Sequence, residues 1–284
     1  MTLKDKLKAY TRTPGSLIVM LLVMLSAILT FSVLIFLIVY VVVHGVPYLK
    51  PSIFSLHYTS ENASLMPALV NTLIITVLSL LIAIPFGVFT AIYLVEYAKK
   101  GSRIVKLIRI TAETLSGIPS IIYGLFGLLF FCTALKWGYC LLAGALTLVI
   151  MILPLIIRTS EEALLSVPDA YREASFGLGA GKLRTIFHVV LPTAIPGILS
   201  GVILATGRIV GETAALLYTA GSVAKIPNLM GSGRTLAVHM YVLSSEGLYM
   251  DQAYATAVVL LVFVLALNGI SNLLAKQLTK GRNA

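Results

Sequence analysis

The segment Tyr171–Pro192 reads YREASFGLGAGKLRTIFHVVLP and is the most informative part of this 284-residue chain. It is a charged stretch between long apolar runs, with small residues and three glycines, and it ends in Leu191-Pro192. Glu173, Ala174 and Ser175 lie in its first half, and Gly179 follows four residues after Ser175. Because spans avoid charge, a segment of this composition indicates a loop at a membrane surface.

The rest of the chain is dominated by apolar residues. Charged residues make up 11% and hydrophobic residues 58%, whereas soluble domains contain about 25% charged residues. Helices satisfy their own backbone hydrogen bonds in lipid, so we predict an all-α membrane protein with six transmembrane helices. The predicted spans are Leu17–Val43, Met66–Val95, Gly117–Leu135, Gly138–Ile157, Thr193–Ala220 and Ala253–Ala275. The first is too long for the apolar core of a signal peptide, so we expect an uncleaved helix.

Lysine and arginine predict the orientation, because cytoplasmic loops carry an excess of both. Of the 21 such residues, Arg208 lies within a span and only four lie in the outer segments, namely Lys50, Lys136, Lys225 and Arg234. Both termini are therefore expected in the cytoplasm. We predict a cytoplasmic tail at 1–16 and one transmembrane domain at 17–284, whose largest cytoplasmic part is the loop at 159–192. The net charge of +10 follows from this topology, and no nucleic-acid binding is predicted.

Two short helices are expected in the loop at 159–192, at Thr159–Val167 and Ala170–Phe176. Pro168 should interrupt them and Asp169 should cap the second. The glycines at 177, 179 and 181 should end it. Such a helix, protruding from the membrane, is suited to sit in a groove of a partner protein and to move as a rigid body.

The loop also holds Gly179-Ala180-Gly181-Lys182, which is similar to the end of a phosphate-binding loop. Phe176 stands where that motif requires its first glycine, and Leu183 stands where it requires Ser or Thr. We therefore expect no ATP binding by this chain.

Arg208 and Glu212 are two charges within the predicted fifth span. Their spacing of four places them on one face of a helix, where they can neutralise each other. An ionisable residue in a membrane span indicates function by default, and the planar fork of arginine matches two oxygens of a tetrahedral oxyanion. We interpret the pair as an anion site in a translocation path. The alternative is an internal ion pair that fixes packing.

Weaker polar candidates lie elsewhere. Arg158 and Glu161 share one helix face at the inner end of the fourth span, and both a pathway role and a simple interface arginine fit them. Asn71 and Thr72 are expected to form hydrogen bonds between helices. Cys132 and Cys140 could form a disulfide, but buried free thiols are favoured. The four histidines are interpreted as interface or loop residues without metal-ligand spacing, namely His44, His57, His188 and His239. No nucleophile–base pattern is present, so the chain is not expected to be an enzyme.

Three stretches of the chain are similar to a known family of proteins. They are residues 156–201, residues 207–221 (GRIVGETAALLYTAG) and residues 234–247 (RTLAVHMYVLSSEG). From the second span to the sixth, the chain resembles the A-type phosphate permeases of bacterial ATP-driven importers. In that superfamily the coupling loop reads E-A-A, three residues, G, nine residues, I, one residue, L-P. Here Ser175 replaces the second alanine and Val189 the isoleucine. The match names Glu173, Ala174, Ser175, Gly179, Leu191 and Pro192 as the residues that couple to the ATPase.

The resemblance implies a bacterial inner-membrane permease that imports inorganic phosphate by alternating access, without a cofactor of its own. The implied partners are two copies of an ATP-binding cassette ATPase, a C-type permease subunit and an extracytoplasmic phosphate-binding protein. The resemblance also implies a role in transport for Arg158, Glu161 and Arg208, and it matches Glu212 to the acid of a G-E-T element. Three alternatives stay open: a permease for phosphonate, sulfate or molybdate, a carrier driven by an ion gradient, and a structural membrane scaffold.

Overall fold

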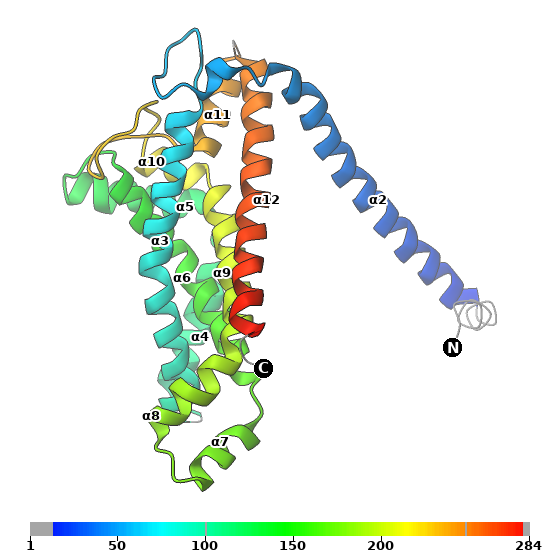
Figure 1. Cartoon of the computed structure of the whole chain (residues 1–284), viewed down its shortest axis with the longest axis vertical. Coiled ribbons are helices and arrows are strands. Elements are labelled where there is room, and N and C mark those ends of the chain that lie inside the picture. The colour runs from blue at the N-terminus through cyan, green and yellow to red at the C-terminus, as the bar shows by residue number, and fades with distance from the viewer. Residues whose placement is uncertain (1–13, 100, 248, 281–284) are drawn as a thin grey trace.

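The structure, a computed structural model, describes residues 14–99, 101–247 and 249–280. Within these ranges it is helical and contains no strand, which confirms the predicted all-α class. The predicted tail at 1–16 lies, except for its last three residues, outside the described part of the chain. Figure 1 shows an elongated bundle of helices, with α2 running obliquely away from it.

Long helices form the frame of the molecule: α2 (Pro14–Gly45), α3 (Met66–Ile92), α6 (Leu141–Leu165), α9 (Leu191–Val210) and α12 (Met250–Lys280). Shorter helices complete the bundle: α4 (Arg103–Ser116), α5 (Ser120–Gly127), α10 (Ala214–Thr219) and α11 (Leu236–Glu246). The loop at 159–192 holds α7 (Asp169–Gly177) and α8 (Lys182–Thr185). Wider π-helical turns continue α3 at Tyr93–Tyr97 and α5 at Leu128–Ala134, and join α8 to α9 at Ile186–Val190. Short 3-10 turns lie at Val46–Tyr48 and Pro51–Phe54.

Five described helices are long and apolar enough to cross a membrane, and a bent pair supplies a sixth if it is counted as one span. The bent pair corrects the predicted span Gly117–Leu135. The chain turns by 101° between Arg103–Ser116 and Ser120–Ala134. Pro119 lacks a backbone N–H and disfavours the helical conformation in the residue before it, so the helix breaks there.

The predicted span Thr193–Ala220 is also wrong as one continuous helix. It ends at Val210, and α10 begins at Ala214 after a break at residues 211–213. The fourth span, in contrast, continues without interruption from Leu141 to Leu165 and absorbs the helix predicted at Thr159–Val167.

Helix α6 lies at the centre of the bundle. Two thirds of its most apolar window is buried, against one third or less in the other candidate spans. Small residues let α9 approach it closely: a Cβ on Gly197 would meet Ala163 at 2.6 Å, and one on Gly201 would overlap Thr159. The two glycines therefore permit close packing of the two helices. Gly207, farther along α9, has no such neighbour in the described structure.

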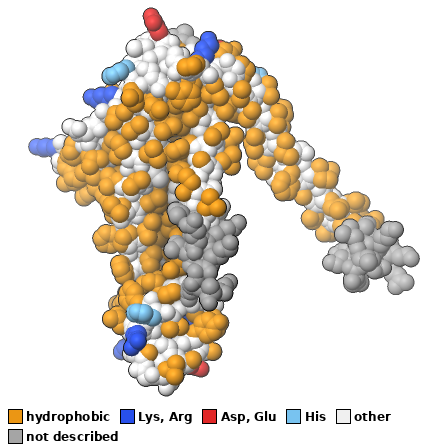
Figure 2. Space-filling model, in the orientation of Figure 1, with side chains coloured by type: hydrophobic (Ala, Val, Ile, Leu, Met, Phe, Trp, Pro, Cys, Tyr) orange, Lys and Arg blue, Asp and Glu red, His pale blue; other side chains and the backbone are white. Residues whose placement is uncertain are grey.

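Helix α2 contributes almost nothing to the core. None of its most apolar window is buried, and Figure 2 shows hydrophobic side chains along its visible length. It is fixed at its C-terminal end, where Gly45 packs against α12 so closely that a Cβ would lie 2.4 Å from the Tyr254 carbonyl oxygen. Figure 2 also shows charged side chains near the two ends of the bundle, with a hydrophobic zone between them.

The minor polar predictions have mixed outcomes. Asn71 donates to the backbone oxygens of Lys225 and Arg234, and the Thr72 hydroxyl accepts from Leu236 N. The bond of Thr72 joins α3 to α11 as predicted, whereas Asn71 bonds to loop residues and not to another helix. The two cysteines are free and buried, as favoured. The interpretation of His239 as a loop or interface residue is wrong, because its side chain is fully buried in α11.

Candidate functional site

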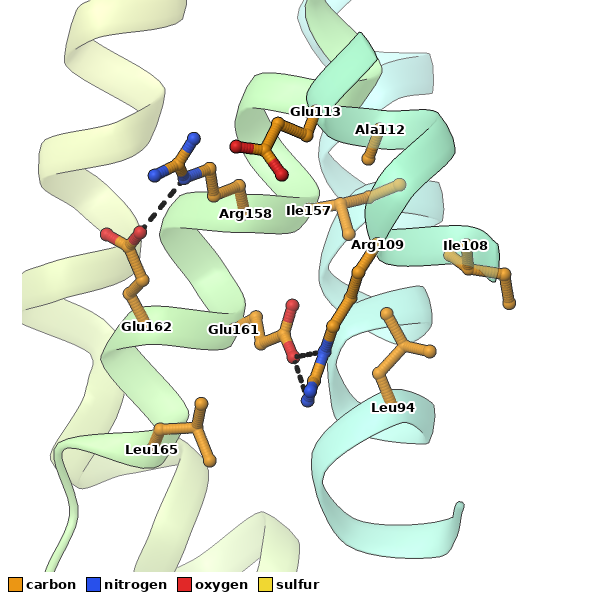
Figure 3. A pocket seen from close by; sticks show the side chains of 10 residues that line it. All are labelled: Leu94, Ile108, Arg109, Ala112, Glu113, Ile157, Arg158, Glu161, Glu162 and Leu165. Atoms are coloured by element: carbon orange, nitrogen blue, oxygen red, sulfur yellow. Dashed lines mark hydrogen bonds and ion pairs between the residues drawn. The ribbon is translucent and has the colours of Figure 1, made fainter. Parts of the chain in front are cut away.

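A charged pocket of about 180 Å³ lies between α4 and α6, near the end of the molecule that carries α7 (Figure 3). Its ionisable lining residues are Arg109 and Glu113 from α4 and Arg158, Glu161 and Glu162 from α6. The two predicted residues, Arg158 and Glu161, therefore do share one site. The pocket therefore brings together two guanidinium groups and three carboxylates.

Arg158 and Glu161 do not pair with each other. Glu161, only 9% exposed, accepts from Arg109 Nε at 2.7 Å, and a second Arg109 nitrogen also contacts it. Arg158 instead contacts Glu162 at 3.1 Å, and both side chains are more than half exposed. An exposed pair four residues apart on a helix contributes about 0.3–0.5 kcal/mol. Glu161 is therefore held in place by a short ion pair, whereas Arg158 is held only by an exposed one.

Sequence reasoning missed Arg109, Glu113 and Glu162. Arg109 was counted only among the cations that set orientation, and its partner stands fifty-two residues away on another helix. Nothing in the local pattern predicts that contact. Glu162, by contrast, could have been found, because its spacing of four from Arg158 is the standard spacing for a helical ion pair.

Arg208 lies in the last turn of α9 and is half-buried. It forms no ion pair with any described residue. Gly201 contacts Thr159 of α6, and Arg208 follows Gly201 by seven residues. At 1.5 Å per residue, Arg208 lies roughly 10 Å farther from α7 than the level of Thr159. Arg158 and Arg208 are therefore two cationic positions at different heights along the α6–α9 pair.

Glu212 does not lie on the same helix face as Arg208, which corrects the predicted pairing. It lies in the break after Val210, is 8% exposed, and its Oε1 accepts from Ala215 N at 3.0 Å. The carboxylate thus satisfies a backbone donor at the start of α10, which a helix leaves unpaired. Gly211 favours the break because glycine is a poor helix former.

The loop helix α7 is close to the prediction. It spans Asp169–Gly177, against the expected Ala170–Phe176, and follows Pro168. Gly179 has a φ of +80°, a conformation that glycine adopts without strain. The Ser175 hydroxyl contacts the Thr185 hydroxyl at 2.8 Å and so joins α7 to α8. Leu191 and Pro192 begin α9, two residues before the predicted start of the span at Thr193.

The surface of this loop that faces away from the helix bundle is exposed and partly apolar. Glu173 and Ala174 are exposed, and Glu173 forms no ion pair with a described residue. Tyr171 is 51% exposed and Leu178 is 90% exposed. Apolar side chains gathered on a protruding helix and turn are typical of a protein–protein contact.

Arg172 attaches α7 firmly to the membrane helices. Its Nε and Nη2 donate to Glu96 Oε1 at 3.0 and 2.9 Å, and both side chains are largely buried. The same guanidinium donates to the backbone oxygens of Leu164 and Val167 at the end of α6. We name this contact the Arg172–Glu96 clamp. It joins α7 to the π-helical turn that continues α3 and to the C-terminal end of α6.

Comparisons with known proteins identify the family of this chain. Residues 83–282 match a family described as "Binding-protein-dependent transport system inner membrane component". The "Probable ABC transporter permease protein YqgI" of Bacillus subtilis is 38% identical over 232 residues, which cover 74% of this chain and 79% of that protein. The "Phosphate transport system permease protein PstA 2" of Mycobacterium bovis is 34% identical over 219 residues, with 75% and 72% covered.

Two further similarities are less complete. "PstA 1" of Mycobacterium tuberculosis is 42% identical over 154 residues, and the match spans about half of each chain, 54% and 50%. A crystal structure of a bacterial ABC transporter that imports the polysaccharide alginate superposes with a TM-score of 0.67 over 89% of this chain and 95% of that chain. At 18% sequence identity this similarity shows the fold alone.

Proposed function

The chain belongs to the family of binding-protein-dependent transport system inner membrane components, and we propose that it is the A-type permease subunit of an ATP-driven importer of inorganic phosphate. Identity of 34% over most of the chain to a protein named as a phosphate transport permease supports the substrate. The Arg172–Glu96 clamp carries the mechanism, because it links an exposed loop helix to two membrane helices.

The clamp supports a motor outside this chain. We propose that an ATP-binding cassette ATPase binds the exposed surface of α7 and the turn after it, and that two copies serve the complete importer. Movement of α7 is transmitted through Arg172 to the ends of α3 and α6. Because α6 is the central helix, such a displacement changes the packing around the path and alternates its access between the two sides.

Arg208 and Arg158 are proposed to form successive contacts for the anion. The fork of each guanidinium matches two phosphate oxygens, and neither is locked in a buried ion pair among the described residues. Glu161 is proposed to line the cytoplasmic end of the anion path, where its hydrogen bond with Arg109 holds its carboxylate in place. Glu212 is proposed to support the path by holding the break that places Arg208 at the end of α9.

The exposed α2 supports assembly with a second permease subunit, which we propose to be the C-type. A helix with such an apolar surface requires lipid or a protein partner along its length. An extracytoplasmic phosphate-binding protein is proposed to deliver the anion at the end opposite α7. The C-terminal end of α12 points toward the α7 end in Figure 1, which supports a cytoplasmic C-terminus in the bacterial inner membrane.

The test is uptake of labelled phosphate by proteoliposomes that contain the complete complex and internal ATP. We expect unlabelled phosphate to compete, and sulfate, molybdate and phosphonate to compete weakly. Stronger competition by one of those anions would reassign the substrate and leave the family unchanged. Uptake driven by an ion gradient without ATP would contradict the proposed mechanism.

A further inference from the structure

A second group of buried polar residues lies at the end of the molecule opposite α7. We name Tyr58, Asn71, Arg234, Thr235 and His239 the outer cluster. Except for Tyr58, its members are at most 4% exposed. Arg234 Nε and Nη2 and Thr235 Oγ1 have no hydrogen-bond partner among the described residues, and the ring nitrogens of His239 have none of normal geometry, although the Ala63 backbone lies beside the ring. Several unpaired groups side by side are unusual, because buried polar groups are nearly always hydrogen-bonded.

The charge of Arg234 is not balanced by an acid. No described carboxylate lies within ion-pair distance of it. Its one favourable charged contact is with the face of the Tyr58 ring, 4.7 Å from Arg234 Cζ. A cation–π contact is weaker than the cost of moving a guanidinium out of water. The buried charge therefore favours an anion as the missing counterpart.

The unpaired nitrogens of Arg234 are arranged so that they can bind two oxygens of one anion. Nε and Nη2 share one edge of the planar guanidinium and point their hydrogens in the same direction, which matches two oxygens of one oxyanion. Burial, followed by the nearby charge of Arg234, lowers the pKa of His239 to about 3. The imidazole is therefore neutral near pH 7 and offers one donor and one acceptor nitrogen.

The backbone around Arg234 is fixed in advance. Asn71 Nδ2 donates to the carbonyl oxygen of Arg234 at 3.1 Å, and the adjacent α11 is tied to α3 by the bond from Leu236 N to Thr72 Oγ1, 2.8 Å long. Tyr58 covers the group, since its ring contacts both Arg234 and, edge to face, His239. Tyr58 belongs to the segment before α3, so displacement of that segment would open the outer cluster.

We propose that Arg234, Thr235 and His239 form an oxyanion-binding site of the phosphate class at this end of the molecule. The site rests on the proposed function in one respect: it would hold the anion before it reaches Arg208. A free anion fits the burial better than a lipid headgroup does, because a headgroup stays attached to its glycerol and acyl chains. Tyr58 acts as the cover that must move for the anion to enter.

Hydrogen exchange of the complete purified complex in detergent tests the site. Inorganic phosphate should slow exchange in peptides that cover residues 55–65 and 234–246. At a phosphate concentration 100 times the Kd, a locally opened segment should exchange up to about 100-fold more slowly. Arg234→Gln should abolish this slowing, and Arg234→Lys, which keeps the charge but loses the fork, should weaken it. Lys225→Gln is the matched control, since it removes an exposed cation from the same outer segment and should leave the slowing unchanged.

The wild-type measurement decides the proposal even if Arg234→Gln fails to assemble. Slowing by sulfate but not by phosphate would support the site and contradict the proposed substrate. A complex that imports phosphate but shows no slowing in these peptides with any oxyanion would overturn the site and leave the proposed function intact. Slowing that appears only in nanodiscs containing phosphatidic acid, without added phosphate, would assign the group to lipid and also overturn the proposal.

Discussion

Among the single residues, Arg208 has the clearest role to test. Loss of the two charge-assisted hydrogen bonds proposed between its guanidinium and phosphate, each about 1.5–3 kcal/mol, would lower anion affinity by at least about 100-fold. We therefore expect Arg208→Gln to abolish phosphate uptake at low substrate while the complex still assembles. Lys50→Gln, which removes an exposed outer cation, should transport normally. Normal uptake by Arg208→Gln in the same vesicles would remove this residue from the path.

The pocket between α4 and α6 holds two ion pairs, and breaking one of them should affect stability more than breaking the other. Arg109→Gln leaves the largely buried Glu161 without its partner, so the thermal unfolding temperature of the solubilised permease should fall by several degrees. Arg158→Gln breaks only an exposed pair and should leave that temperature nearly unchanged. Uptake should fall in both variants. Equal unfolding temperatures in the two variants would show that Arg109 does not hold Glu161.

Arg158 and Glu161 of the pocket could be predicted from the sequence, as could Arg208 outside it, but their partners could not. Arg158, Glu161 and Arg208 were identified by charge inside or beside apolar spans. The pairing of Glu161 with Arg109 depends on how α4 packs against α6, and the local pattern does not encode that contact. Glu212 was placed on the wrong surface because a spacing of four implies one helix face only where the helix is unbroken.

For the elements, the Arg172–Glu96 clamp gives the sharpest prediction. Arg172→Gln and Glu96→Gln should each uncouple the importer, so that more ATP is hydrolysed for each phosphate moved. Because the two side chains contact each other directly, the double variant should be little worse than either single one. The ratio of ATP hydrolysed to phosphate transported measures this. Asp169→Asn, which alters only the exposed partner of Arg172, is the control. Additive effects of the two substitutions would contradict a direct clamp.

The turn after α7 supplies a second test. Gly179 has a positive φ that a β-branched residue adopts only with strain, so Gly179→Val should distort the exposed surface and weaken co-purification of the ATPase. Gly177→Ala is the control in the same loop, since Gly177 has no positive φ and its added methyl group meets nothing within 4 Å. It should retain the ATPase. Equal retention by both variants would show that the turn does not form the contact.

The loop helix and most spans followed from composition, Pro168 and the glycines, whereas the breaks within spans did not. The bend at Pro119 was overlooked because the residues around it are apolar enough to read as one span. The break at residues 211–213 is stabilised by a side chain, Glu212, that accepts from the next helix. Both features depend on local backbone geometry, which hydropathy does not report.

In the whole molecule, α2 is the long helix whose apolar surface is not covered by the rest of the described chain. Its apolar surface has no partner along most of its length within the described structure. We expect a variant that lacks residues 1–44 to insert in the membrane but to lose the second permease subunit during purification in detergent. Retention of that subunit would show that other surfaces carry the assembly, and the inserted but unassembled chain is detected by its own affinity tag.

The central claim is that this chain moves phosphate only when an ATPase on its loop helix drives it. The most direct measurement is phosphate uptake into proteoliposomes that contain either the complete complex or the two permease subunits without the ATPase. The account predicts ATP-dependent uptake by the complex and no accumulation without the ATPase. Concentrative uptake by the permease subunits alone would contradict it.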